Sequence, residues 1–127
     1  MINQSLEDLR GRRLLIVEDD YMIATDLTHW FEDAGAEVVG PAGSVSKALA
    51  LVASHAEQLD AAVLDVNLRD EKVFPVAEAL SKAGVPFIFA TGYDAHIIPE
   101  TYVEVPRCEK PVDLLQLARL LGQVVGS

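Results

Sequence analysis

The sequence predicts an α/β fold in which helices cover both faces of a doubly wound sheet of five parallel strands. Apolar runs alternate with helical patterns along the 127 residues, as expected when helices connect parallel strands. The run at residues 61–66 is apolar at every position but one, which is typical of a strand buried on both faces. Polar residues directly follow several runs, at the edge where open α/β sheets bind ligands.

The first half of the chain is expected to supply two strands and two helices. Residues 1–11 are interpreted as an N-terminal extension that can form a short helix, and residues 12–125 as the domain itself. Gly35, Pro41 and Ser44 mark a helix end, a strand end and a helix start. The elements predicted in this half are a strand at residues 14–17, a helix at 21–34, a strand at 36–40 and a helix at 44–55.

The second half is expected to complete the sheet. The predicted elements are a strand at residues 61–65, a helix at 73–83, strands at 86–90 and 103–107, and a helix at 114–125. Residues 94–104 are poorly patterned, with one helical turn before Pro99. We therefore expect the fourth helix to be short or irregular.

Composition excludes several classes of function. The formal net charge of -10 leaves no basic surface for nucleic acid. A single cysteine, Cys108, permits no internal disulfide, which favours a reducing compartment. No apolar run approaches the roughly 18 residues of a membrane span. The sequence therefore predicts one acidic cytoplasmic domain that contacts neither membrane nor nucleic acid.

Polar side chains follow four of the five predicted strands. They are Glu18 and Asp19 after the first strand, Asp65 at the end of the third, Thr91 after the fourth and Lys110 after the fifth. Right-handed crossovers place the carboxyl ends of parallel strands at one edge, so we expect these side chains to lie together. The alternative for the acids is a purely structural role at a helix N-terminus, because helix N-termini favour carboxylates. Asp20 fits that role, but three adjacent acids are more than a cap requires.

The expected cluster suits phosphoryl chemistry. Oxygen ligands from Glu18, Asp19 and Asp65 suit Mg²⁺, a hard cation. Asp65 is a candidate nucleophile that forms an acyl phosphate. Lys110 and the Thr91 hydroxyl are candidates to offset charge on the phosphoryl oxygens. We expect Lys110 to meet that charge only after phosphorylation, and so to matter little for folding.

Over residues 12–125 the sequence resembles the receiver domain of bacterial two-component response regulators. That resemblance implies a flavodoxin-like fold, phosphorylation by a sensor histidine kinase with Mg²⁺, and a cis peptide bond at Lys110-Pro111. It also implies roles for particular residues: Asp65 as phosphoacceptor, Thr91 and Lys110 as its partners, Glu18, Asp19 and Asp65 as metal ligands, and Asn67 as a metal ligand through its main-chain carbonyl.

Two features mark the sequence within that family. Receivers usually carry Tyr or Phe three residues before the lysine, a ring that turns inward on activation, and here Arg107 takes that position. Residues 86–93 (PFIFATGY) resemble a subgroup named for its Phe-Ala-Thr-Gly-Tyr motif, whose members are often stand-alone receivers of alphaproteobacteria. Because the usual ring is missing, we expect the signal to travel by rearrangement of residues 93–103, with Tyr93 covering the phosphoryl site.

Three functions remain open at this level. The favoured function is a single-domain receiver that is not an enzyme, is a monomer or weak homodimer, and acts through an unknown downstream protein or as a phosphate sink. A small phosphatase of the haloacid dehalogenase type is a second, but it needs an acid two residues after the nucleophile, where this chain has Asn67. A docking module that works without phosphorylation is the third.

Overall fold

The structure, a computed structural model, describes residues 4–92 and 95–125. Its main sheet contains the strands β1 (Arg13–Val17), β2 (Glu37–Ala42), β3 (Ala61–Asp65), β6 (Phe87–Thr91) and β7 (Arg107–Glu109). They are parallel and lie in the order β2-β1-β3-β6-β7. The predicted fold class is therefore confirmed.

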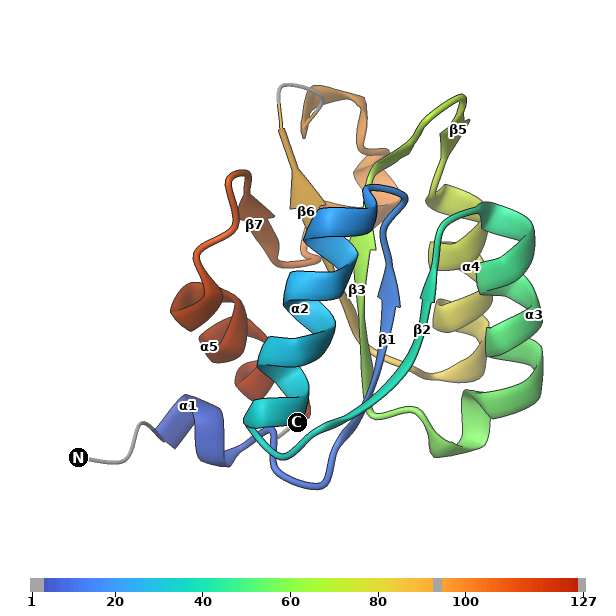
Figure 1. Cartoon of the computed structure of the whole chain (residues 1–127). Helices are drawn as coiled ribbons and strands as arrows, with labels where there is room; N and C mark the ends of the chain where they lie inside the picture. Colours follow the sequence, from blue (N-terminus) through green and yellow to red (C-terminus); the bar gives the residue numbers. More distant parts are fainter. Residues whose placement is uncertain (1–3, 93–94, 126–127) are drawn as a thin grey trace.

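Helices cover the sheet on both sides (Figure 1). One layer consists of α1 (Gln4–Glu7), α2 (Tyr21–Asp33) and α5 (Leu114–Val125), and the other of α3 (Val45–His55) and α4 (Phe74–Ala83). A 3₁₀ turn, η1 (Ala56–Gln58), extends α3. Within the described part of the chain, none of these helices has the length and apolar character needed to cross a membrane.

Two apolar cores lie on opposite faces of the sheet, because alternate side chains of a strand point to opposite sides. From β1, Leu15 and Val17 pack toward α3 and α4, while Leu14 and Ile16 pack toward α2 and α5. Full burial of each such side chain stabilises the fold by about 1.5–3 kcal/mol. The resulting rigid sheet holds the ends of its strands in place.

Local sequence explains where the helices on the α3–α4 side begin and end. The Ser44 hydroxyl caps α3 by accepting a hydrogen bond from the Lys47 amide at 3.2 Å. Gly84 ends α4 with a left-handed backbone, φ 76°, which glycine adopts at little cost. These boundaries agree with the helices expected from the pattern.

Two strand boundaries differ from the expectation. β2 does not stop at Gly40 but continues through a cis Gly40-Pro41 bond to Ala42. The last strand was expected at 103–107 and is instead β7, which pairs with β6 from Phe89↔Arg107 onward. The apolar residue Val105 packs against the core from a turn, so its burial does not require a strand.

The expectation of a short or irregular fourth helix is confirmed. Two 3₁₀ turns, η2 (Ala95–Ile97) and η3 (Glu100–Tyr102), replace it. The ring of Tyr102 packs against Phe74, Phe87 and Phe89, with centroid distances of 6.1, 6.0 and 5.8 Å. This aromatic contact anchors the segment to the core, and the sequence pattern alone did not indicate it.

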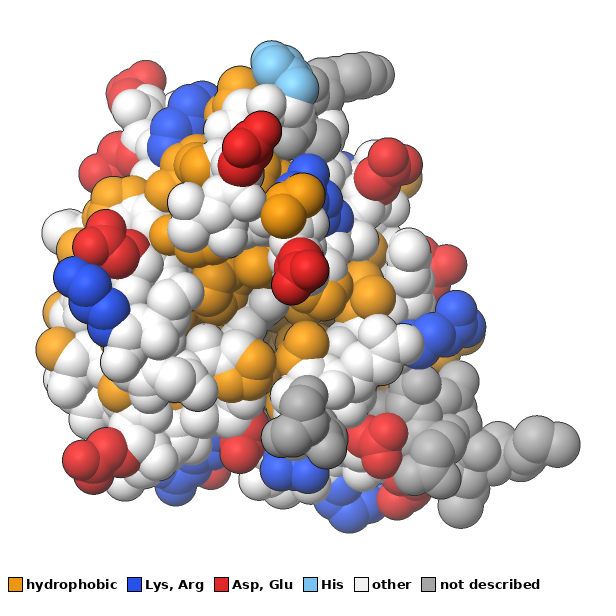
Figure 2. All heavy atoms as spheres, turned by 180° about the vertical axis from the view of Figure 1, so that it is seen from behind, with side chains coloured by type: hydrophobic (Ala, Val, Ile, Leu, Met, Phe, Trp, Pro, Cys, Tyr) orange, Lys and Arg blue, Asp and Glu red, His pale blue; other side chains and the backbone are white. Residues whose placement is uncertain are grey.

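Beside this aromatic cluster lies an open hollow of about 590 Å³. Apolar side chains gather around hollows on this side of the molecule (Figure 2). Phe87, Tyr102, Val105 and Pro106 line the hollow together with polar residues. It lies at the beginning of β6, away from the carboxyl ends of the strands.

The N-terminal residues also contribute to the core. Leu9 is fully buried in the cluster beneath α2 and α5. A side chain at Gly122 of α5 would meet the Asp8 carboxylate at 3.1 Å. Close contact between the two segments therefore favours glycine at position 122.

One element is absent from the sequence-based expectation. After β3 the chain forms a small antiparallel hairpin of β4 (Asn67–Leu68) and β5 (Glu71–Lys72). Strands of two residues are too short to show a periodic pattern. The turn residue Arg69 has φ 53° and is the only described residue other than glycine with positive φ.

Candidate functional site

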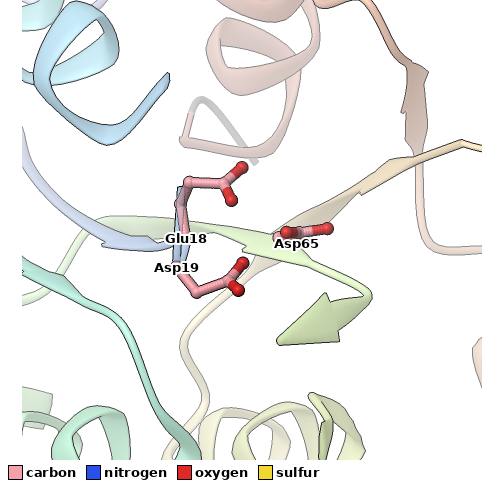
Figure 3. A group of neighbouring side chains, drawn as sticks. All are labelled: Glu18, Asp19 and Asp65. Atoms are coloured by element: carbon pink, nitrogen blue, oxygen red, sulfur yellow. The ribbon is translucent and has the colours of Figure 1, made fainter. Parts of the chain in front are cut away.

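Three carboxylates meet at the carboxyl edge of the sheet (Figure 3). Glu18 and Asp19 follow β1, and Asp65 ends the neighbouring strand β3. Val17 pairs with Leu64 in the register of these strands, so the residues that follow emerge side by side. One ligand oxygen from each carboxylate lies within 4.8 Å of the others.

The third acid of the run serves the helix instead. Asp20 Oδ1 accepts hydrogen bonds from the amides of Met22 at 2.9 Å and Ile23 at 3.1 Å. It thereby caps the N-terminus of α2. The structure thus divides the acidic run: Asp20 acts as a cap, while Glu18 and Asp19 point toward Asp65.

Glu18 is an unusually placed carboxyl group. Only 4% of its side chain is exposed, and its Oε2 accepts a hydrogen bond from the Asp20 amide at 3.1 Å. Burial, followed by the hydrogen bond and charge of Asp65, raises the pKa of Glu18 to about 7. A second cation beside Lys110 would favour its ionised form.

Lys110 connects two of the carboxylates. Its Nζ lies 2.9 Å from Asp65 Oδ1 and 3.6 Å from Glu18 Oε1. Burial alone would lower the pKa of Lys110, but the hydrogen bond and charge of Asp65, together with Glu18, outweigh burial and raise that pKa. Contrary to the expectation from sequence, Lys110 therefore meets charge in this structure without a phosphoryl group.

Thr91 and Lys110 are held beside Asp65 by the sheet. Asp65 pairs in register with Ala90, so Thr91 follows at the same edge, and Thr91 is buried. The Lys110 amide donates a 2.7 Å hydrogen bond to the Thr91 carbonyl. The Lys110-Pro111 bond is cis, as the family resemblance implies.

Asn67 lies at the start of the hairpin and lines an open depression of about 530 Å³ with the acids and Lys110. Lys72 donates a hydrogen bond to Asn67 Oδ1. Tyr93, which was expected to cover this site, lies outside the described residues.

Arg69 is a residue of this depression that sequence reasoning missed. Its Nε lies 3.5 Å from Asp19 Oδ2. The local pattern did not predict this contact, because it depends on how the hairpin folds back over the end of β1. A basic residue four positions after the candidate nucleophile was the only available indication.

The chemistry of this donor set fits a hard divalent cation. All the converging side-chain ligands are carboxylate oxygens, the ligand type of Mg²⁺. Lys110 contacts two of the carboxylates and Arg69 the third, so the cluster holds more negative than positive charge. A dication between the oxygens would offset the difference.

The raised pKa of Glu18 predicts that the stability of the folded protein depends on pH. With divalent cations chelated, we expect the free energy of unfolding to decrease as pH rises from 4.5 toward about 7, by roughly 1 kcal/mol per pH unit. The sign follows because the folded protein retains a proton in this range that the unfolded chain has lost. Urea unfolding at several pH values measures the slope. Glu18→Gln should flatten it, and an unchanged slope in that variant would assign the dependence to other groups.

No protein-family model matches the sequence. The chain is similar to SdrG from Sphingomonas melonis Fr1, whose solution structure is 37% identical, with a TM-score of 0.78 over 92% of this chain and 98% of SdrG. The BeF3-activated conformation of SdrG from Pseudomonas melonis Fr1 is also 37% identical, with a TM-score of 0.73 over 89% of this chain and 95% of that one.

A similar relative of known sequence is the transcriptional regulatory protein PdtaR of Mycobacterium tuberculosis. It is 31% identical over 90 residues, which cover 70% of this chain and 43% of PdtaR. The chain thus matches less than half the length of that relative. A crystal structure of a response regulator receiver domain protein from Clostridium thermocellum has a TM-score of 0.81 over 91% of this chain and 94% of that one. Its 18% identity shows the fold alone.

SdrG is matched over almost its whole length at 37% identity, and the receiver fold is shared with the Clostridium protein. The chain belongs to the response regulator receiver domain family.

Proposed function

We propose that this domain is a phosphorylation switch in which Asp65 accepts a phosphoryl group from the phosphohistidine of a sensor histidine kinase. One observation carries the proposal. Asp65 ends a central strand with its carboxylate 2.9 Å from Lys110 Nζ and within 4.8 Å of two further carboxylates. A nucleophile, a cation and a metal-ligand set therefore share one edge of the sheet.

In the transfer step, an oxygen of the Asp65 carboxylate attacks phosphorus, and the bond between phosphorus and the histidine nitrogen breaks. The bond's electron pair stays on the imidazole. The ring leaves as neutral imidazole when its other nitrogen is already protonated, and otherwise it takes up one proton from solvent. The product is an acyl phosphate on Asp65.

The other residues have distinct roles in the proposal. Lys110 stays beside Asp65 and offsets charge on one phosphoryl oxygen, while the Thr91 hydroxyl donates to another. Glu18, Asp19, Asp65 and the Asn67 main-chain carbonyl would hold Mg²⁺, which would supply further charge neutralisation.

The similarity to SdrG supports the proposed phosphorylation switch. SdrG, similar over nearly its full length, has a BeF3-activated conformation, and that group mimics a phosphoryl group on a carboxylate. Residues 89–93 support a place in the Phe-Ala-Thr-Gly-Tyr subgroup. Signalling through contacts with a downstream protein, or drainage of phosphoryl groups from a kinase, would follow from the same reaction.

Mapping the phosphoryl group tests the proposal directly. The protein should gain the mass of one phosphoryl group when it is incubated with Mg²⁺ and acetyl phosphate. Borohydride reduction of the acyl phosphate, followed by peptide mass spectrometry, should then find homoserine at position 65. Homoserine at another position, or no gain in mass with acetyl phosphate or with a phosphorylated kinase, would contradict the proposal.

A further inference from the structure

Arg69 has a backbone conformation that arginine does not favour. It lies in the turn between β4 and β5 with φ 53°, a region that Gly and Asn adopt more readily than residues with long side chains. The turn accounts for the positive φ but not for the presence of arginine rather than Gly or Asn. Residues other than glycine with positive φ often occur at functional sites, which suggests that the arginine side chain has a function.

The Arg69 side chain reaches the candidate site while remaining open to solvent. Its Nε lies 3.5 Å from Asp19 Oδ2, yet 81% of the side chain is exposed. It lines the same depression as Asp65 and Lys110. The guanidinium is thus tied to the acidic cluster by one weak, exposed contact.

We infer that Arg69 exchanges partners: it neutralises Asp19 until a divalent cation takes that carboxylate, and it then binds the incoming phosphoryl group. This inference rests on the proposed function. It adds a second cationic residue to the site, supplied by the hairpin rather than by the end of a sheet strand.

The first half of the exchange follows from competition for one carboxylate. Asp19 is among the three carboxylates that could hold a cation, and Arg69 contacts its Oδ2. A dication and a guanidinium repel each other, and the dication is attracted more strongly to the carboxylates. Arg69 should therefore leave Asp19 when the cation binds.

The second half follows from the charge that a phosphoryl group brings. Lys110 already lies against both Asp65 and Glu18, so much of its charge is offset before phosphorylation. A released guanidinium beside the same depression supplies a planar fork of donors that matches phosphate oxygens. Its exposure means that little packing must be broken for it to move.

Arg69→Asn tests the exchange, because asparagine removes the charge and tolerates the positive φ. We expect the variant to fold at least as stably as the parent. Two equilibrium constants are then measured: Mg²⁺ affinity, from the rise in thermal stability with Mg²⁺ concentration, and the affinity of the Mg²⁺-loaded protein for beryllofluoride. The first should become about two- to fivefold tighter, and the second roughly tenfold weaker.

Two further variants separate contact from general charge. Lys47→Gln removes one positive charge from α3 beside Arg69, where both residues line a neighbouring depression. It should leave both constants nearly unchanged at physiological salt. Arg69→Lys should recover part of the beryllofluoride affinity, because it restores charge without the planar fork.

Opposite shifts in Arg69→Asn that are absent in Lys47→Gln support the exchange. Equal shifts in the two variants, or the lack of either shift in Arg69→Asn, would overturn it. Failure of the proposed function looks different. In that case the parent protein itself would bind no beryllofluoride and accept no phosphoryl group from acetyl phosphate.

Discussion

Asp65→Asn is expected to abolish phosphorylation by acetyl phosphate, because an amide cannot act as the carboxylate nucleophile. The substitution keeps the shape of the side chain, and Lys110 keeps its other carboxylate partner, Glu18. The variant should therefore fold. Intact-protein mass spectrometry measures incorporation, and a thermal unfolding curve verifies the fold.

Asp70→Asn is a matched control for this experiment. Asp70 is an exposed aspartate in the turn of the β4–β5 hairpin and is not among the clustered carboxylates. We expect the Asp70→Asn variant to be phosphorylated at the parental rate. Phosphoryl incorporation that persists in Asp65→Asn, for example on Asp19, would refute the assignment of Asp65.

Lys110→Met is expected to cause the largest loss of stability. Removal of the ammonium leaves the carboxylates of Asp65 and Glu18, which are 6% and 4% exposed, without their cation. Breaking a buried pair in this way costs about 3–5 kcal/mol. Since 29% of the Lys110 side chain is exposed, we expect a loss of about 2–3 kcal/mol at pH 8.

The loss should depend on pH and on divalent cations. It should be smaller at pH 6, because Glu18, with its pKa raised to about 7, is then largely protonated and brings less negative charge beside Asp65. Added Mg²⁺ should recover part of it by replacing the missing positive charge. Urea unfolding with a chelator, and then with Mg²⁺, measures both effects.

Lys82→Met provides the comparison. It breaks the 2.9 Å pair between Lys82 and Glu78 on the surface of α4, where both side chains are mostly exposed. Such pairs contribute about 0–1 kcal/mol. If Lys110→Met were as stable as Lys82→Met at pH 8, Lys110 would not be a counter-ion of the acidic cluster in the folded protein.

Local sequence was sufficient for the longer strands and helices and for every candidate residue except Arg69. Apolar runs and helical spacing are properties of neighbouring residues, and so are the capping residue Ser44 and the stop at Gly84. The rule that parallel strands share one carboxyl edge then brings Asp65 beside Glu18 and Asp19 without any knowledge of coordinates. The family resemblance added the roles that those residues are proposed to play.

Local pattern was insufficient for the short elements. The strands of the β4–β5 hairpin have two residues each, and β7 has three. At such lengths hydrophobic periodicity carries almost no information. The last strand was placed too early for this reason, since Val105 is packed against the core by a turn and not by the sheet.

The sequence by itself determined the order of strands and helices, the acidic composition and the group of side chains that meet at one edge. Only the tertiary structure decided which partner each of them contacts. Lys110 pairs with Asp65, Arg69 pairs with Asp19, and the Tyr102 ring packs against Phe89. The physical reason is that these contacts join residues from different strands, turns and loops, so their distances depend on the register and packing of the whole sheet.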